Sequence, residues 1–99
     1  MELREYYNIA KVITIGTYDN MTHAIGFDRD KIKRGKYDAW RNRYITNDTQ
    51  EDTQIFDIAV ENGIVERFGY SPAAVGFRVT QKGLDFISIR ENCKVTESD

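Results

Sequence analysis

Residues 64–91 read IVERFGYSPAAVGFRVTQKGLDFISIRE, and this stretch decides the fold. The run 64–68 is rich in β-branched and aromatic residues, and 75–80 alternates apolar with polar or small residues, as in a strand with one buried face. Between them, 69–72 contains glycine, serine and the only proline of the chain, which are turn residues. The stretch therefore predicts a β-hairpin whose second strand buries Val75, Phe77 and Val79.

A helix is expected directly after this hairpin. Thr80 is placed to cap it, and its apolar positions are Leu84, Phe86 and Ile87. A helix, a β-hairpin and a closing helix form the C-terminal half of a winged-helix domain. The sequence therefore predicts an α+β fold, a small winged-helix-like domain in which helices are followed by a β-hairpin and a closing helix.

The helix before the hairpin is predicted over 50–62. Asp48 followed by Glu51 resembles a capping box, and Gly63 suits the left-handed residue that ends a helix. The core stripe of this helix is Ile55, Ile58 and Ala59, with Phe56 and Val60 alongside.

Two further helices are predicted near the N-terminus. Apolar residues recur at helical spacing over 3–15. The β-branched run 12–15 also suits a strand, and we favour a helix that ends near Gly16. A second short helix then closes at Gly26. Its cap is Asp19 or Asn20, and its buried face carries Met21 and Ile25.

Length and composition indicate one domain. The chain has 99 residues, 40% of them hydrophobic, and we place a single domain at 1–99 with a frayed polar tail at 94–99. No apolar run approaches the ~20 residues that span a bilayer, and the start, MELREYY, is unlike a secretory signal. The single cysteine, Cys93, fits a reducing compartment. We expect a cytoplasmic protein without a membrane contact.

Charge is divided unevenly along the chain. Residues 27–44 hold seven Lys and Arg and three Asp, a local charge of +4, whereas the remainder carries −6, which gives the net −2. Such a density of bases exceeds what solubility requires. The segment therefore predicts a surface for a partner or for nucleic acid, made of Arg29, Lys31, Lys33, Arg34, Lys36, Trp40, Arg41 and Arg43.

The aromatic residues of this segment have two interpretations. Tyr37, Trp40 and Tyr44 can stack on bases or on a partner's arginine, or they can belong to the core. A short helix from Lys36 would turn the three rings inward and turn Arg41 and Arg43 outward.

The helix 50–62 argues against ordinary reading of a DNA groove. It takes the place of the recognition helix of a winged-helix domain, yet its charged residues are all acidic. Carboxylates brought close to phosphates are repelled. Either DNA is bound by 29–43, or the target is a protein. A secondary contact face comprises Glu51, Asp52, Asp57, Glu61, Arg67 and Arg78.

No enzyme chemistry is predicted. His23 is the only histidine, and it has no second histidine or cysteine nearby to complete a metal site. Neither a phosphate-binding loop nor a dinucleotide fingerprint is present in the sequence. The acids of 48–61 are typical of a solvated helix face. We therefore predict no catalytic, cofactor or metal site.

Four blocks, HAIGFD, KRGKYDAWRNRYIT, IAVENGIVERF and FRVTQKGLDFI, occur in this order. The order resembles a group of small uncharacterised bacteriophage and prophage proteins, of which the first two blocks are distinctive. The matching positions are His23, Gly26, Asp28, Lys33, Arg34, Gly35, Lys36, Arg41, Asn42, Tyr44, Glu61, Gly63, Glu66, Arg67, Val79, Thr80, Gly83 and Leu84. The chain departs from the group over 1–18 and at Asp38 and Ala39. The resemblance implies origin in a phage or mobile element, and no particular activity.

These features lead to one hypothesis and two alternatives. The first is a phage-type accessory protein that binds without catalysis and inhibits a host or defence nucleoprotein complex, such as a CRISPR effector, in the cytoplasm of the bacterial host cell. One alternative is a winged-helix, DNA-binding transcriptional regulator. The other is a structural or assembly component of the phage particle. The partner is accordingly a protein complex or nucleic acid, with a homodimer as a further expectation.

Overall fold

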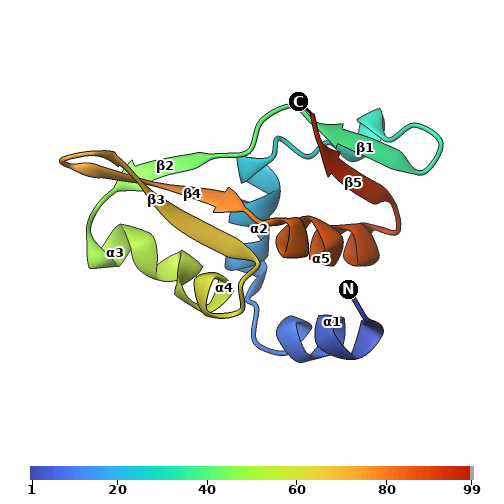
Figure 1. Ribbon diagram of the computed structural model, residues 1–99, viewed down its shortest axis with the longest axis horizontal. Coiled ribbons are helices and arrows are strands. Elements are labelled where there is room, and N and C mark those ends of the chain that lie inside the picture. The colour runs from blue at the N-terminus through green and yellow to red at the C-terminus, as the bar shows by residue number, and fades with distance from the viewer. Residues whose placement is uncertain (99) are drawn as a thin grey trace.

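Two small sheets and a set of short helices build an α+β fold (Figure 1). The computed structural model describes residues 1–98. Strands β2 (Tyr44–Asn47), β4 (Ala74–Val79) and β3 (Val65–Ser71) form an antiparallel sheet in that spatial order. Strand β1 (Lys36–Ala39) pairs in parallel with β5 (Lys94–Glu97) in the second sheet.

The helical elements connect and cover these sheets. They are α1 (Leu3–Ala10), α2 (Ile15–Ala24), the 3-10 turn η1 (Arg29–Lys31), α3 (Gln50–Thr53), the 3-10 turn η2 (Gln54–Phe56), α4 (Asp57–Glu61) and α5 (Gln81–Glu91). The molecule measures 42 × 29 × 19 Å. Along its longest axis, α3 and the tip of the β3–β4 hairpin lie at one end, β1 and β5 lie at the other, and α4 lies between them on the side of α3 (Figure 1). Within residues 1–98, no helix combines the length and the apolar composition needed to cross a membrane.

The predicted hairpin is confirmed. β3 and β4 pair in antiparallel, and the inward residues of β4 are buried while Arg78 is exposed. The ring of Phe68 crosses β4 at Gly76, where an added Cβ would lie only 2.2 Å from a ring carbon. Glycine is therefore needed at this crossing.

The predicted closing helix is also confirmed. The hydroxyl of Thr80 accepts a hydrogen bond from the N–H of Gly83 at 3.1 Å and caps α5. An added Cβ on Gly83 would lie 2.0 Å from the carbonyl oxygen of Ile64, so glycine lets the helix pack closely on the start of β3. The predicted apolar positions Leu84, Phe86 and Ile87 are buried.

The core lies between the three-stranded sheet and the helices. The rings of Phe56 and Phe77 stack with centroids 4.3 Å apart, and Tyr44 meets Phe56 edge to face at 5.1 Å. Met21 and Ile25, which we predicted on one buried face, are fully buried. This packing joins η2 to the sheet through aromatic contacts, which add to the burial of apolar area.

The predicted N-terminal helix is shorter than expected. It ends at Ala10, and the hydroxyl of Thr14 accepts the N–H of Thr17 at 3.1 Å, which starts α2 there. Gly16 thus lies inside α2, and the caps predicted at Asp19 and Asn20 are wrong. A new helix begins after Thr14 because the Thr14 hydroxyl accepts a hydrogen bond from an N–H of the first turn that has no partner within the helix.

The helix predicted over 50–62 needs correction, whereas the predicted end of α2 is confirmed. Gly26 follows α2 with φ 64°. The helix expected over 50–62 is divided into α3, η2 and α4, and Thr49 caps it in place of Asp48, because the Thr49 hydroxyl accepts the N–H of Asp52. Gly63 has φ 71° and ends it as predicted. In this broken helix, Phe56 and Ala59 are the fully buried residues, whereas Ile55 and Ile58 are only partly buried.

The helix predicted from Lys36 is wrong, because this segment forms β1 and β2. Arg34 and Gly35 have φ 53° and 73°, and Lys33 and Lys36 exchange two backbone hydrogen bonds of 2.9 and 3.0 Å. This is a two-residue turn of the kind that favours positive φ at both central positions. After this turn the chain is extended from Lys36 as β1, so the predicted helix does not form.

The tail predicted as frayed is a strand. β5 places Lys94 opposite Lys36 and Val95 opposite Tyr37, and Val95 is buried. The Val95 N–H donates to the Ser88 hydroxyl at 2.9 Å, which anchors β5 to α5. Burial of Val95 and pairing with β1 therefore order this segment up to Glu97. Asp99 lies outside the described residues.

Candidate functional site

The predicted basic segment does not form one uniform surface. Arg29 donates two hydrogen bonds to the Glu91 carboxylate at 2.7 and 2.9 Å. Arg41 donates to the carbonyl oxygen of His23 at 2.6 and 3.2 Å, and its guanidinium lies 4.7 Å from the Trp40 ring centroid. These two arginines therefore hold the fold together. The exposed bases that remain are Lys31, Lys33, Arg34, Lys36 and Arg43.

Three of the lysines surround one concavity. It has a volume of about 540 Å³ and lies beside β1. Its lining, which we name the lysine slot, consists of Lys31, Lys33, Lys36, Tyr37, Asp38 and Trp40. Because the 33–36 turn pairs its arms only at Lys33 and Lys36, the chain before it diverges from β1 and leaves this space open.

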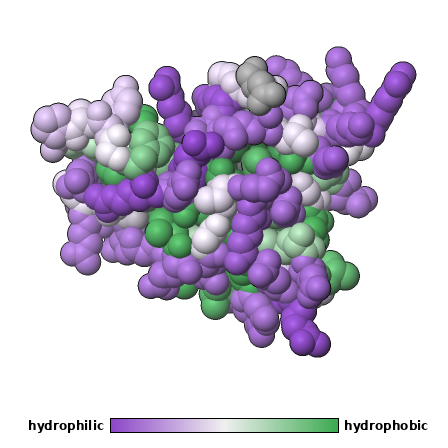
Figure 2. All heavy atoms as spheres, in the orientation of Figure 1, coloured by the Kyte–Doolittle hydropathy of each residue, from purple (hydrophilic) through white to green (hydrophobic). Residues whose placement is uncertain are grey.

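The sequence did not predict the contribution of Lys94. The parallel register places Lys94 beside Lys36 and Thr96 beside Asp38, and these four residues line an adjoining hollow of about 290 Å³. The Thr96 hydroxyl donates to the Asp38 carboxylate at 2.7 Å. We name the surface formed by the lysine slot and Lys94 the basic face. Its end of the molecule is covered by hydrophilic side chains (Figure 2).

Trp40 lies on this face and not in the core, which agrees with the surface interpretation of this ring and not with the inward orientation in the predicted helix. Its side chain is 64% exposed, whereas Tyr37 and Ala39 are buried. One edge of the indole rests on Gly26, where an added Cβ would lie 2.5 Å from Nε1. Strand alternation turns Tyr37 and Ala39 inward, and the next residue that follows is turned outward.

The first two blocks of the phage-like pattern pack against each other. The Arg43 N–H donates to the Ala24 carbonyl at 3.0 Å, and the Tyr37 hydroxyl donates to the carbonyl of Gly26. The rings of Phe27 and Tyr37 meet edge to face at 4.9 Å. In this region His23 and Gly26 contribute backbone carbonyl groups, so the structure gives these residues a positioning role for β1 and Trp40.

The basic face carries four ammonium groups and one carboxylate. Within residues 1–98, none of Lys31, Lys33, Lys36 and Lys94 forms an ion pair, and the carboxylate, Asp38, accepts the bond from Thr96. The two adjoining hollows therefore have a net positive charge, which produces a potential that attracts anions.

A polar cluster lies behind the basic segment. Burial would raise the pKa of Glu91, but hydrogen bonds from Arg29 and from the Tyr18 hydroxyl outweigh it, and its pKa lies below the ordinary value. Burial, together with Glu91, raises the pKa of Tyr18, so the phenol remains a donor. Arg90 lies over the Tyr18 ring with its guanidinium carbon 4.4 Å from the centroid. This cluster ties η1 and α2 to the C-terminal end of α5.

The predicted secondary contact face lies elsewhere and is partly neutralised. Arg67 forms an ion pair with Asp48, and Arg78 forms ion pairs with Glu66 at 3.1 Å and with Glu97 at 3.5 Å. The acidic members lie on α3, at the other end of the long axis from β1, and on α4, nearer the middle (Figure 1). Those that are exposed are Glu51, Asp57 and Glu61, and Asp52 is half-buried.

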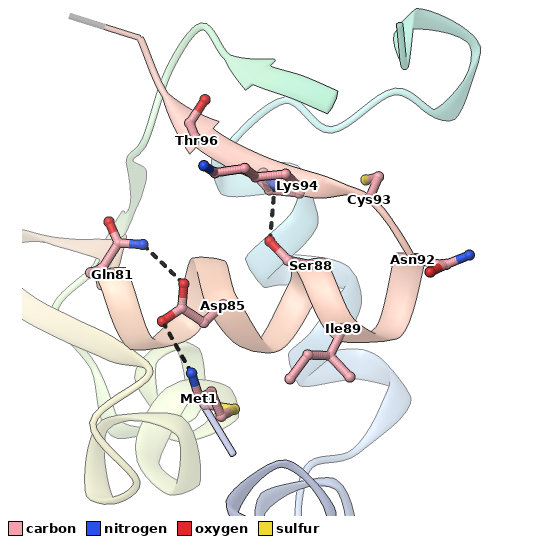
Figure 3. Close-up of a pocket in the computed structure, with 10 residues that line it drawn as sticks. Met1, Gln81, Asp85, Ser88, Ile89, Asn92, Cys93, Lys94 and Thr96 are labelled. Carbon is pink, nitrogen blue, oxygen red and sulfur yellow. Dashed lines mark hydrogen bonds and ion pairs between the residues drawn. The ribbon is translucent and has the colours of Figure 1, made fainter. Parts of the chain in front are cut away.

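A further hollow of about 610 Å³ lies between α5 and β5 (Figure 3). The Ser88 hydroxyl in it is already bonded to the Val95 N–H and to the carbonyl of Leu84. Burial, together with Glu91, raises the pKa of the Cys93 thiol, which disfavours the reactive thiolate. In the part of the chain that the structure describes, no group of three or more His, Cys, Asp or Glu side chains is arranged to hold a metal ion.

Comparison with family models, with curated proteins and with solved structures gave no match to this chain. The site is therefore interpreted from its own geometry.

Proposed function

We propose that this protein acts by binding without catalysis, and that its basic face binds the phosphate backbone of a nucleic acid. The observation that carries the proposal is the set of three lysines, Lys31, Lys33 and Lys36, that line one concavity with the exposed Trp40. Lys94 lies next to Lys36, and within residues 1–98 none of the four lysines forms an ion pair. Lysines that neutralise phosphates release condensed counterions, which favours binding. An aromatic ring beside them supplies a surface for stacking.

The chain order supports a winged-helix-like version of this proposal. α2, β2, α3, α4, β3 and β4 follow one another, and the sheet order is β2-β4-β3. The helix before the hairpin, α4, nevertheless carries exposed Asp57 and Glu61. Because these carboxylates repel phosphates, the contact is assigned to the basic face and not to α4.

Fluorescence anisotropy of a labelled oligonucleotide tests the proposal. The variant Lys36→Ala/Lys94→Ala removes two neighbouring charges from the basic face, and we expect weaker binding with a salt dependence shallower by about 0.7–0.9 per lost contact. The matched control is Arg4→Ala/Lys11→Ala, which removes the same charge from the exposed surface of α1 and its C-terminal end. An equal loss of affinity in both variants would show that only the net charge matters, and it would reject the basic face as the binding site.

A second candidate function, inhibition of a host or defence nucleoprotein complex such as a CRISPR effector, is favoured by the acidic end. The exposed carboxylates lie on α3, at the end of the long axis opposite β1, and on α4, between the two ends (Figure 1). Such an acidic surface complements a basic, nucleic-acid-binding protein surface. The resemblance to phage proteins supports the same kind of target.

An effector-cleavage assay tests this second candidate. We expect the purified protein to reduce target cleavage by a CRISPR effector, and we expect Glu51→Lys/Glu61→Lys to abolish that inhibition. The variant Glu2→Lys/Glu5→Lys changes the charge equally on α1 and just before it. No inhibition by the unaltered protein, or equal loss in both variants, rejects this candidate for the effector tested.

A further inference from the structure

We infer that the lysine slot takes an unpaired nucleobase stacked on Trp40, so that the preferred ligand of the basic face is a single strand. This inference rests on the proposed function and names its ligand class. The slot volume of about 540 Å³ lies within the range of small-ligand sites and is sufficient for one nucleotide.

The indole of Trp40 presents a surface suited to a base. Gly26 holds one edge of the ring, and the Arg41 guanidinium lies over it at 4.7 Å. Arg41 is not among the residues that line the slot, whereas Trp40 is, so the part of the indole that faces the slot is not covered by Arg41. The ring is therefore held in place while 64% of the residue remains exposed.

Backbone groups of β1 complete the slot. Gly35 and Ala39 accept hydrogen bonds from the N–H groups of Lys94 and Ser98 at 2.8 and 2.9 Å, so alternate residues of this strand face β5. Asp38 therefore faces away from β5, so its N–H and C=O lie at the edge of β1 that β5 does not cover. A donor beside an acceptor can bond the pairing edge of an unpaired base.

The charges of the face place the backbone of the strand. Lys31 and Lys33 come from the chain before the 33–36 turn, whereas Lys36 belongs to β1 and lies next to Lys94 of β5. Phosphates on both sides of a stacked base can thus each meet an ammonium group. In a duplex, both faces of every base are already stacked, so a base must be flipped out before it can reach Trp40.

Intrinsic fluorescence offers a direct test, because Trp40 is the only tryptophan. The probes are oligothymidine of about twelve nucleotides, a length within the site sizes of single-strand binders, and a duplex of the same length. We expect the single strand to bind more tightly and to quench Trp40. The variants Trp40→Ala and Trp40→Phe lack this signal, so their affinities are measured by anisotropy of the labelled probes. Trp40→Ala should weaken single-strand binding by roughly tenfold while the duplex affinity stays unchanged, and Trp40→Phe should retain part of the affinity.

The outcomes separate the inference from the proposed function. Equal affinity for both probes, or an unchanged affinity in Trp40→Ala, overturns the inference. If Lys36→Ala/Lys94→Ala still weakens binding in that case, the proposed function stands. Absence of binding to either probe at low salt rejects both. Thermal melting of each Trp40 variant verifies that the fold is intact.

Discussion

The side chain of Asn42 bonds both backbone polar groups of Val79. Its Nδ2 donates to the Val79 carbonyl at 2.8 Å, and its Oδ1 accepts the Val79 N–H at 2.8 Å. The amide thus pairs with β4 two residues before β2 begins at Tyr44. It attaches residues 40–43 to the end of the hairpin.

Loss of this amide should destabilise the fold. Val79 is buried, so Asn42→Ala leaves two backbone groups without partners, and we expect the free energy of unfolding to fall by about 2–3 kcal/mol in urea denaturation. Asn8→Ala, on the exposed face of α1, is the control and should change it by less than about 0.5 kcal/mol. A loss at Asn42 no greater than at Asn8 would contradict the role assigned to the amide.

Gly26 should be required for the position of Trp40. Gly26→Ala combines the strain of a positive φ, about 1–2 kcal/mol, with a collision against the indole, so it should both destabilise the protein and shift the Trp40 emission. Gly35→Ala has a similar φ of 73° but no atom within 4 Å of the added Cβ. It should therefore show the strain alone, with unchanged emission. Identical spectra for the two variants would rule out the proposed contact.

Local signals explain which elements were predictable from the sequence. The hairpin, the Thr80 cap and two of the glycines predicted to end helices, Gly26 and Gly63, depend on neighbours along the chain, and all of these are present. Gly16, predicted to end the first helix, lies inside α2. The structure of the basic segment was predicted incorrectly because its aromatic residues are spaced as in a helix. The turn at Arg34 and Gly35 instead places the following residues in a strand. Two consecutive positive φ angles at that point were the deciding feature, and an Arg-Gly pair signals them only weakly.

The site itself depends on a contact between distant segments. β1 and β5 pair in parallel, which requires a long connection and leaves no local pattern. Lys94 was therefore assigned to a tail although it lies beside Lys36. Likewise, Arg29 counted as a binding residue because its ion partner, Glu91, is far along the chain. Of the predicted bases, Lys31, Lys33 and Lys36 do line one surface.

The Glu91 cluster should make stability depend on pH. The pKa of Glu91 is lower in the folded than in the unfolded chain, where 4.5 is the reference value, so the folded state binds fewer protons. Its contribution is present above the unfolded pKa and is lost as the pH falls through the folded pKa. Glu91→Gln should remove this contribution, so the difference in stability from the unaltered protein should shrink as the pH falls from about 6 to 2.

Urea denaturation across that pH range measures the effect. Glu61→Gln is the control, since Glu61 is exposed and forms no ion pair within residues 1–98. A constant difference between Glu91→Gln and the unaltered protein at every pH would show that the carboxylate is not held by Arg29 and Tyr18.

The lysines of the basic face should each contribute to the salt dependence of nucleic-acid binding. Single substitutions Lys31→Ala, Lys33→Ala, Lys36→Ala and Lys94→Ala should each make the slope of log K against log salt shallower by about 0.7 for a single strand, because each removes one phosphate contact. Lys11→Ala lies outside the face and should leave the slope unchanged. Anisotropy measured over a range of salt concentrations gives these slopes. They show whether the lysines of the basic face contact phosphates directly or act only through the net charge of the protein. If Lys94→Ala leaves the slope unaltered while Lys36→Ala reduces it, the strand does not extend over β5, and the face ends at the lysine slot.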